Sequence, residues 1–185
     1  VHEKIYQRFV AGFAARARAL RVGDGLHETT QMGPLAHDRR LDAMDTLLRD
    51  AREHGASFDA GGARIAGKGY FWQPTVLSAL SNDARIMNEE PFGPVAIINP
   101  FREFDSVMRE ANRLPYGLAA YAFTRSARTV NLLGEQLEAG IVSINSFQIS
   151  VPESPFGGVK ESGHGSEEGI EGLDGCLVTK FVSEA

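Results

Sequence analysis

Two segments of the chain place a phenylalanine between a proline and a glycine, and both carry charge beside the ring. The first is 88–94 (NEEPFGP) and the second is 154–160 (SPFGGVK). Proline fixes φ and lacks an amide donor, whereas glycine lets backbone or ligand approach closely. Two carboxylates precede the first ring and Lys160 follows the second, so each loop can present charge next to an apolar surface. This combination predicts a ligand-binding cleft.

The paired carboxylates and the second ring each leave two interpretations open. Glu89 and Glu90 by themselves are typical of solvated surface charges. A carboxylate that accepts two hydroxyl hydrogen bonds is also the usual way to bind a ribose, and Phe92, two residues after Glu90, can pack on a flat heterocycle. Phe156 either packs in the core or lines a substrate channel.

Other catalytic arrangements have little support. The histidines are scattered, with no pair at helical ligand spacing, so we expect no metal site: His2, His27, His37, His54 and His164. The chain has no Gly-x-Ser-x-Gly motif, and we expect its one cysteine, Cys176, to be a small packing residue. The glycine-rich run 163–169 departs from the dinucleotide fingerprint in its last spacing, and we expect a loop that leads into a helix.

Composition restricts the class of protein and of partner. The 185 residues are 43% hydrophobic, enough for a real core, and their net charge of -5 is spread along the chain. There is no basic stripe for nucleic acid and no apolar run near the roughly 20 residues that span a bilayer. One cysteine cannot form an internal disulfide, which agrees with a reducing compartment, by default the cytoplasm. We expect small-molecule or protein partners. Because the chain opens at Val1 and runs directly into a helical pattern, we also expect a piece of a longer protein.

Hydrophobic periodicity predicts the elements of the first half. Apolar residues recur at three and four from Glu3 to Leu20, and again around Leu41, Met44, Leu48 and Ala51, so both stretches are predicted helices. The segment Ser57–Ala66, broken by two glycines, predicts a short hairpin, and Phe71–Leu77 predicts a strand.

The stretch from Val95 to Asn145 predicts the fold class, because strand-length apolar runs alternate there with helical patterns. The predicted strands are 95–98, 118–123 and 141–144, and the predicted helices between them are 105–113 and 128–138. Apolar strands linked by helices indicate an α/β fold with a parallel open sheet and flanking helices. Ligands bind such sheets at the carboxyl ends of the strands, where Asn145 lies. A last alternating segment, Leu177–Val182, predicts a strand that leaves the globule.

Several motifs together resemble the aldehyde dehydrogenase superfamily in order and spacing, over nearly the whole chain: 31–34, 69–76, 88–95, 114–118, 140–145 and 154–163. The resemblance implies oxidation of an aldehyde to an acid with NAD or NADP, through a cysteine thiohemiacetal and thioester. It also places the nucleophilic cysteine, the base glutamate and the nucleotide-binding domain upstream of Val1. Cys176 matches no catalytic position, so this chain is expected to be inactive alone.

The resemblance also assigns roles to particular residues. Glu90 would bind the nicotinamide-side ribose and Phe92 would pack beside the nicotinamide, while Arg40 matches a cofactor-proximal position only loosely. Phe156, with the loop that contains Phe147 and Ser150, would line the aldehyde channel. A hydroxyl at Ser150 resembles the semialdehyde dehydrogenases, succinic semialdehyde being one such substrate, in which it helps to hold a distal carboxylate.

The resemblance implies a division of the chain as well. Residues 1–172 would form part of the catalytic domain, and residues 173–185, with Lys180, an oligomerisation strand that adds to a partner's sheet in a homodimer or homotetramer. An edge strand of its own domain is the alternative. The rival function is a non-catalytic oligomerisation or binding module that kept the fold.

Overall fold

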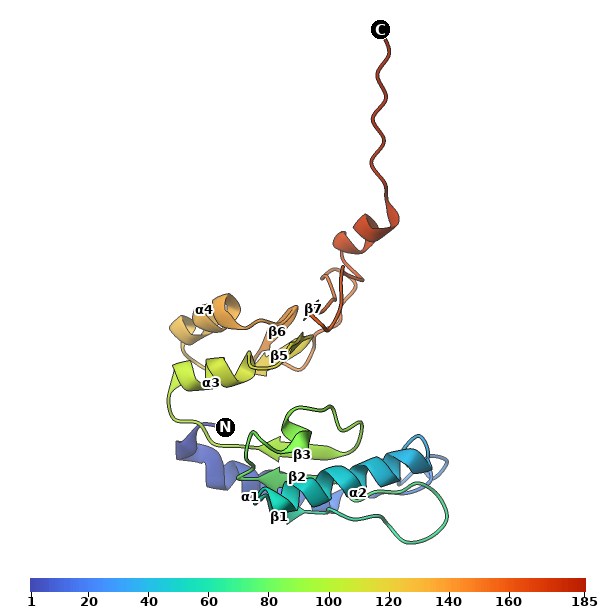
Figure 1. Cartoon of the computed structure of the whole chain (residues 1–185), viewed down its shortest axis with the longest axis vertical. Helices are drawn as coiled ribbons and strands as arrows, with labels where there is room; N and C mark the ends of the chain where they lie inside the picture. Colours follow the sequence, from blue (N-terminus) through green and yellow to red (C-terminus); the bar gives the residue numbers. More distant parts are fainter. The chain divides into compact units, whose positions relative to one another are not determined.

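The computed structural model describes all residues from 1 to 185, which form two compact units, Val1–Arg102 and Glu103–Ala185 (Figure 1). The first unit contains α1 (Glu3–Ala19), α2 (Asp38–Glu53), β1 (Ser57–Ala60), β2 (Thr75–Ser78), the 3-10 helix η1 (Arg85–Met87) and β3 (Val95–Ile98). The second contains α3 (Phe104–Ala111), β4 (Tyr116–Gly117), β5 (Ala119–Ala122), α4 (Ala127–Gln136), β6 (Ile141–Ile144), β7 (Val159–Lys160) and the 3-10 helix η2 (Glu171–Cys176). The predicted α/β class is confirmed.

The sheet of the first unit has the order β1-β2-β3 and is covered by a helix on each face. Strands β2 and β3 are parallel, and β1 runs antiparallel to β2. Successive side chains of β2 point to opposite faces. Val76 packs with Val10 and Ala14 of α1, whereas Leu77 packs with the apolar side of α2. All four residues of β2 are buried, as expected of a strand covered on both faces.

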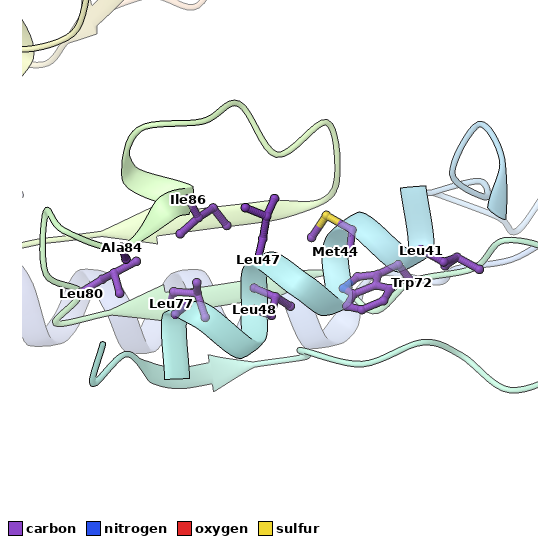
Figure 2. Close-up of a cluster of buried hydrophobic side chains, with 10 residues drawn as sticks. Leu41, Met44, Leu47, Leu48, Trp72, Leu77, Leu80, Ala84 and Ile86 are labelled. Atoms are coloured by element: carbon purple, nitrogen blue, oxygen red, sulfur yellow. The ribbon is translucent and has the colours of Figure 1, made fainter. Parts of the chain in front are cut away.

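The larger apolar cluster lies between α2 and the sheet and is drawn in Figure 2. Met44, Leu48, Leu77 and Trp72 are almost completely buried in it, with Trp72 only 1% exposed. The residues that the sequence placed on one face of the second helix, Leu41, Met44, Leu48 and Ala51, all belong to this cluster. The 3.6-residue periodicity therefore identified the buried side of α2.

The hairpin predicted over Ser57–Ala66 is wrong. Both halves of that segment pair with residues 71–78 instead: β1 with β2, and Arg64 with Trp72 in an antiparallel bridge. Gly61 and Gly62 have φ of 64° and 95° and bend the chain between the two pairings. A Cβ at Gly61 would lie 2.3 Å from the carbonyl oxygen of Pro74, so the close approach there requires glycine.

The second unit contains the helices and strands predicted from residue 103 to residue 145. Strands β5 and β6 form a parallel pair, from Ala119↔Ile141 to Ala122↔Ile144, and β4 pairs antiparallel with β7. The order of strands and helices from 95 to 145 is confirmed. In the first unit, β3 pairs in parallel with β2, which precedes it in the chain. Sequence order does not fix which strands become neighbours.

The strand predicted over Leu177–Val182 is absent from the structure of this chain. Residues 177–185 continue from η2 without any β pairing (Figure 1), and Val178 and Phe181 are 94% and 89% exposed. A strand exists only when its backbone pairs with another, and residues 177–185 form no such pairing. Cys176 is also exposed, since η2 buries no residue, so its predicted packing role is wrong. No helix has the length and apolar character needed to span a membrane.

Candidate functional site

The first proline-phenylalanine-glycine segment lies against helix α2. A Cβ at Gly93 would lie 2.4 Å from the sulfur of Met44, so glycine allows the loop to approach the helix. Phe92 has a φ of 43°, in the left-handed region, and the residue is 64% exposed. A bulky residue at positive φ is uncommon and is held there by its surroundings. The loop therefore displays the ring of Phe92 rather than burying it.

Hydrogen bonds fix both ends of this loop. The side-chain amide of Asn88 donates to the carbonyl oxygens of Asn82 at 2.8 Å and of Ala84 at 2.9 Å. At the other end the amide of Thr75 donates to the carbonyl of Pro94 at 2.8 Å, at the start of the β2-β3 pairing. Asn88 and Pro94 are thus both held in place, and the five residues between them, Glu89 to Gly93, extend from these two anchored ends.

The two neighbouring carboxylates have different environments. Glu89 accepts two hydrogen bonds from the guanidinium of Arg85, at 2.9 and 3.0 Å. These bonds lower the pKa of Glu89 and raise the pKa of Arg85. Glu90 is exposed and makes no hydrogen bond or ion pair. Of the two, only Glu90 has a carboxylate free to accept hydrogen bonds from a ligand.

Arg40 lies beside Phe92. Its guanidinium carbon is 5.8 Å from the centroid of the Phe92 ring, within the range of a cation–π contact. The structure thus brings Arg40 and Phe92 together from different parts of the first unit. An exposed aromatic ring and a free carboxylate suit a ligand with a flat ring and hydroxyl groups, such as a nicotinamide riboside. These residues therefore fit the cofactor that the resemblance implies.

In the second unit, Phe147 belongs to an exposed aromatic group that follows β5 and β6. Its ring centroid is 5.7 Å from that of Tyr121 and 5.2 Å from that of Phe123, and Phe147 is 75% exposed. Asn145, predicted to lie at a ligand-binding strand end, joins the ends of the two strands. Its side chain accepts from the amide of Thr124 at 2.9 Å and donates to the carbonyl of Thr124 at 2.8 Å. These two hydrogen bonds give Asn145 a structural role, because they join the end of β6 to the chain after β5.

Ser150 and Phe156 are both tied to residues 167–168. The amide and carbonyl of Phe156 each bond to the backbone of Glu167 at 2.7 Å. The hydroxyl of Ser150 donates to Oε1 of Glu168 at 2.9 Å. Phe156 is half-buried, which agrees with either alternative left open by the sequence, core packing or the lining of a substrate channel. The structure therefore brings these two predicted channel residues onto one framework, in the second unit.

Lys160 does not present its charge to a cleft, and that interpretation of the second motif is wrong. Its ammonium donates to the carbonyls of Asn112 at 3.0 Å and Leu114 at 3.2 Å, and it forms an ion pair with Glu138. Asn112 is the C-cap of α3. Carbonyls at a helix C-terminus lack partners within the helix and attract cations. Lys160 therefore fastens β7 to the end of α3.

Comparison with known proteins decides the family. The sequence model described as "Aldehyde dehydrogenase family" matches residues 1–182. The chain belongs to the aldehyde dehydrogenase family.

Similar aldehyde dehydrogenases and related enzymes are much longer than this chain. It is 47% identical over 182 residues to a putative 4-(hydroxymethyl)benzenesulfonate dehydrogenase of Comamonas testosteroni, covering 98% of this chain and 38% of that protein. It is 42% identical over 181 residues to a non-phosphorylating aspartate-semialdehyde dehydrogenase of Halomonas elongata, covering 98% and 37%. An NAD+ complex of an aldehyde dehydrogenase from Bacillus cereus superposes with a TM-score of 0.90 at 37% identity, covering 94% of this chain and 35% of that one. The chain thus spans less than two fifths of the length of these relatives.

Sequence reasoning missed one polar residue of this aldehyde dehydrogenase chain that contacts a predicted channel residue. Glu168 was seen only as part of a glycine-rich loop, although its carboxylate accepts the hydroxyl of Ser150. Its φ of 60° is unusual for a glutamate, and no local pattern in the sequence predicts it.

Proposed function

We propose that the complete protein oxidises an aldehyde to a carboxylic acid with NAD or NADP, and that this chain supplies part of its catalytic domain. The observation that carries the proposal is the free carboxylate of Glu90, two residues before the exposed Phe92, while Glu89 is bonded to Arg85. Glu90 would accept hydrogen bonds from ribose hydroxyls, and Phe92 would pack beside the nicotinamide. Membership of the family and the similarity to an NAD+ complex support this assignment. The bound nicotinamide would supply the hydride acceptor.

The remaining roles follow the same proposal. Phe147, Ser150 and Phe156 line the aldehyde channel, and residues 1–172 are the catalytic-domain part. Cys176 is not the nucleophile, because it is exposed on a 3-10 helix near the end of the chain and no base is hydrogen-bonded to it. The nucleophile and base come from other parts of the protein, so these 185 residues alone do not catalyse the reaction.

We further propose that the substrate is a semialdehyde, an aldehyde with an acidic group at its other end. The support comes from the relatives: one is named for aspartate semialdehyde, and another for a compound that carries a sulfonate. Ser150 by itself gives little support, because its one hydroxyl proton is donated to Glu168. Succinic semialdehyde is the simplest substrate of this class for an assay.

A second proposal concerns assembly. Leu177, Val178, Phe181 and Val182 are between 69% and 94% exposed, which leaves apolar side chains along an unpaired segment. Residues 173–185 would form the oligomerisation strand of a homodimer or homotetramer. The same observation is what favours the rival function, a non-catalytic oligomerisation module.

The direct test is aldehyde-dependent reduction of NAD or NADP by the complete protein. We expect turnover of succinic semialdehyde or a simple aldehyde such as propanal at about 1 to 1000 per second, with equimolar carboxylic acid as product. Cys176→Ser is expected to keep that rate, because the thiol plays no part. Absence of cofactor reduction with every aldehyde, in a protein that is folded and oligomeric, would support the rival module.

A further inference from the structure

The first residues of the chain pair in parallel with the residues that follow β3. The amine of Val1 donates to the carbonyl of Asn99 at 2.8 Å. The amide of Phe101 donates to the carbonyl of Val1 at 2.9 Å, and its carbonyl accepts from the amide of Glu3 at 2.8 Å. This is the hydrogen-bond pattern of two parallel strands, with His2 opposite Phe101. The pairing breaks off at Val1, although β3 lies further along the same edge.

The edge of β3 next to this pairing has no strand beside it. β3 is the last strand in the order β1-β2-β3. In a parallel sheet, the N–H and C=O of successive residues point alternately to one neighbouring strand and to the other. The carbonyl of Pro94 accepts from Thr75 of β2, whereas the carbonyl of Asn99 accepts from Val1. Ile97 has the parity of Asn99, so its N–H and C=O point away from β2, to the side where Figure 1 shows the N-terminus.

An apolar groove lies beside the start of β3, on the face of the sheet that α1 covers. It has a volume of about 510 Å³ and is lined by residues of α1, by the start of β2 and by residues 93–96. Phe13 and Leu20 line it, and each is 40% exposed. Val1 is half-buried and packs against the apolar cluster on this same face. Because every second side chain of a strand shares a face, a strand that continued back from Val1 would direct alternate side chains to this groove.

We propose that the residues directly before Val1 in the complete protein pair in parallel with the free edge of β3 and cover this groove. The occupant belongs to the same protein, since this chain matches only 38% of the length of a relative at 47% identity. The backbone N–H of Val1 keeps its bond to Asn99 in a continuous chain. Counting back from His2 opposite Phe101, the third residue before Val1 lies opposite Ile97. Unpaired strand edges bind further strands readily.

The pairing also has a consequence for the candidate cofactor site. The loop of Phe92 directly precedes β3, so a segment that runs back along β3 leads to this loop. It would bring residues from before Val1 to the site. The inference does not depend on the proposed function, because the pairing can form whether or not the protein oxidises aldehydes.

Paired cysteines in the complete protein test the register. Ile97→Cys is combined with a cysteine at the third residue before Val1, in a Cys176→Ser background that removes an exposed thiol. Neighbouring strands lie about 4.8 Å apart, which is within the Cα separation that a disulfide spans. We expect a bridge in more than about half of the molecules after mild oxidation, identified by mass spectrometry of unreduced peptides. Ala96→Cys with a cysteine at the fourth residue before Val1 tests the same register on the other face of the sheet.

The matched control moves only the second cysteine. At the fifth residue before Val1 it shares the face of Ile97 but lies two residues further along the strand, at a Cα separation of about 8 Å. A disulfide spans at most about 7 Å, so we expect less than about a tenth of the molecules to be bridged. Hydrogen exchange of the wild-type complete protein needs no variant. The amides of Ile97 and Asn99 should exchange at least about a hundredfold more slowly than in an unfolded chain.

Each result supports or overturns the pairing. Bridging in the control that equals or exceeds bridging in the in-register pairs would overturn the register. Rapid exchange at Ile97 would show that the edge stays open and would overturn the pairing itself. Slow exchange without a bridge in either in-register pair would show that another part of the protein covers β3, which overturns this occupant. Absence of aldehyde oxidation in a protein that forms the in-register bridges would overturn the proposed function and leave the pairing in place.

Discussion

Glu90→Gln in the complete protein should lower kcat/KM for the cofactor by about ten- to a hundredfold. A carboxylate that accepts two ribose hydroxyls contributes hydrogen bonds to a charged group, worth about 1.5 to 3 kcal/mol, and each 1.4 kcal/mol corresponds to a factor of about ten. Glu90 has no partner within the chain, so its replacement removes little else. Initial rates at varied NAD or NADP, with saturating aldehyde, measure the effect.

Glu89→Gln is the matched control for this variant. The change is chemically identical and lies one residue away, but Glu89 is bonded to Arg85 in an exposed pair. Exposed pairs contribute little to stability, so we expect kcat/KM for the cofactor to stay within about twofold of the wild type. Equal losses in the two variants would contradict the separation of roles between these neighbours, and a larger loss in Glu89→Gln would reverse it.

Trp72→Ala should lower the free energy of unfolding of the first unit by about 3 to 5 kcal/mol, the usual cost of removing a large buried aromatic side chain. Trp72 is 1% exposed within the cluster between α2 and the sheet (Figure 2), and its indole nitrogen donates to Oγ1 of Thr75 at 3.2 Å. The variant loses apolar contacts and leaves a cavity. Urea unfolding followed by far-ultraviolet circular dichroism measures the change.

Trp72→Phe separates packing from hydrogen bonding at the same position. It keeps an aromatic ring in the cluster but removes the donor to Thr75, whose hydroxyl still accepts from the amide of Gly62 at 2.9 Å and donates to the carbonyl of Gln73 at 2.8 Å. We expect a smaller loss, about 1 to 2 kcal/mol. A loss below about 1 kcal/mol for Trp72→Ala would show that this cluster does not hold the first unit together.

The helices were predictable because their packing leaves a local pattern in the sequence. The apolar face of α2 repeats every three to four residues, and every residue assigned to it is buried in one cluster. Strand pairing was less predictable, because partners distant in sequence leave no such pattern. Gly61 and Gly62 suggested a hairpin, whereas they bend a segment whose partner is residues 71–78. In the same way, nothing in Val95–Ile98 indicates that it pairs with β2.

In the candidate site as well, the sequence alone did not show which side chains are already bonded within the chain. Glu89 and Glu90 are identical in type, and only the position of Arg85 distinguishes the occupied carboxylate from the free one. Lys160 was interpreted as a charge that faces a ligand, but its ammonium donates hydrogen bonds to two carbonyl groups at the end of α3. Glu168 was not singled out, since the hydrogen bond that its carboxylate accepts comes from Ser150, which is distant in sequence and adjacent in space. Residue type suggests the possible chemistry, and contacts decide which residues are free to perform it.

The most direct test of the cofactor assignment is a crystal structure of the complete protein with NAD or NADP bound. We expect a carboxylate oxygen of Glu90 at about 2.5 to 3.0 Å from a hydroxyl of the nicotinamide-side ribose, with the ring of Phe92 beside the nicotinamide. Glu89 should remain bonded to Arg85. A cofactor bound with Glu90 in solvent and Phe92 away from the nicotinamide would rule out the cofactor roles of both residues.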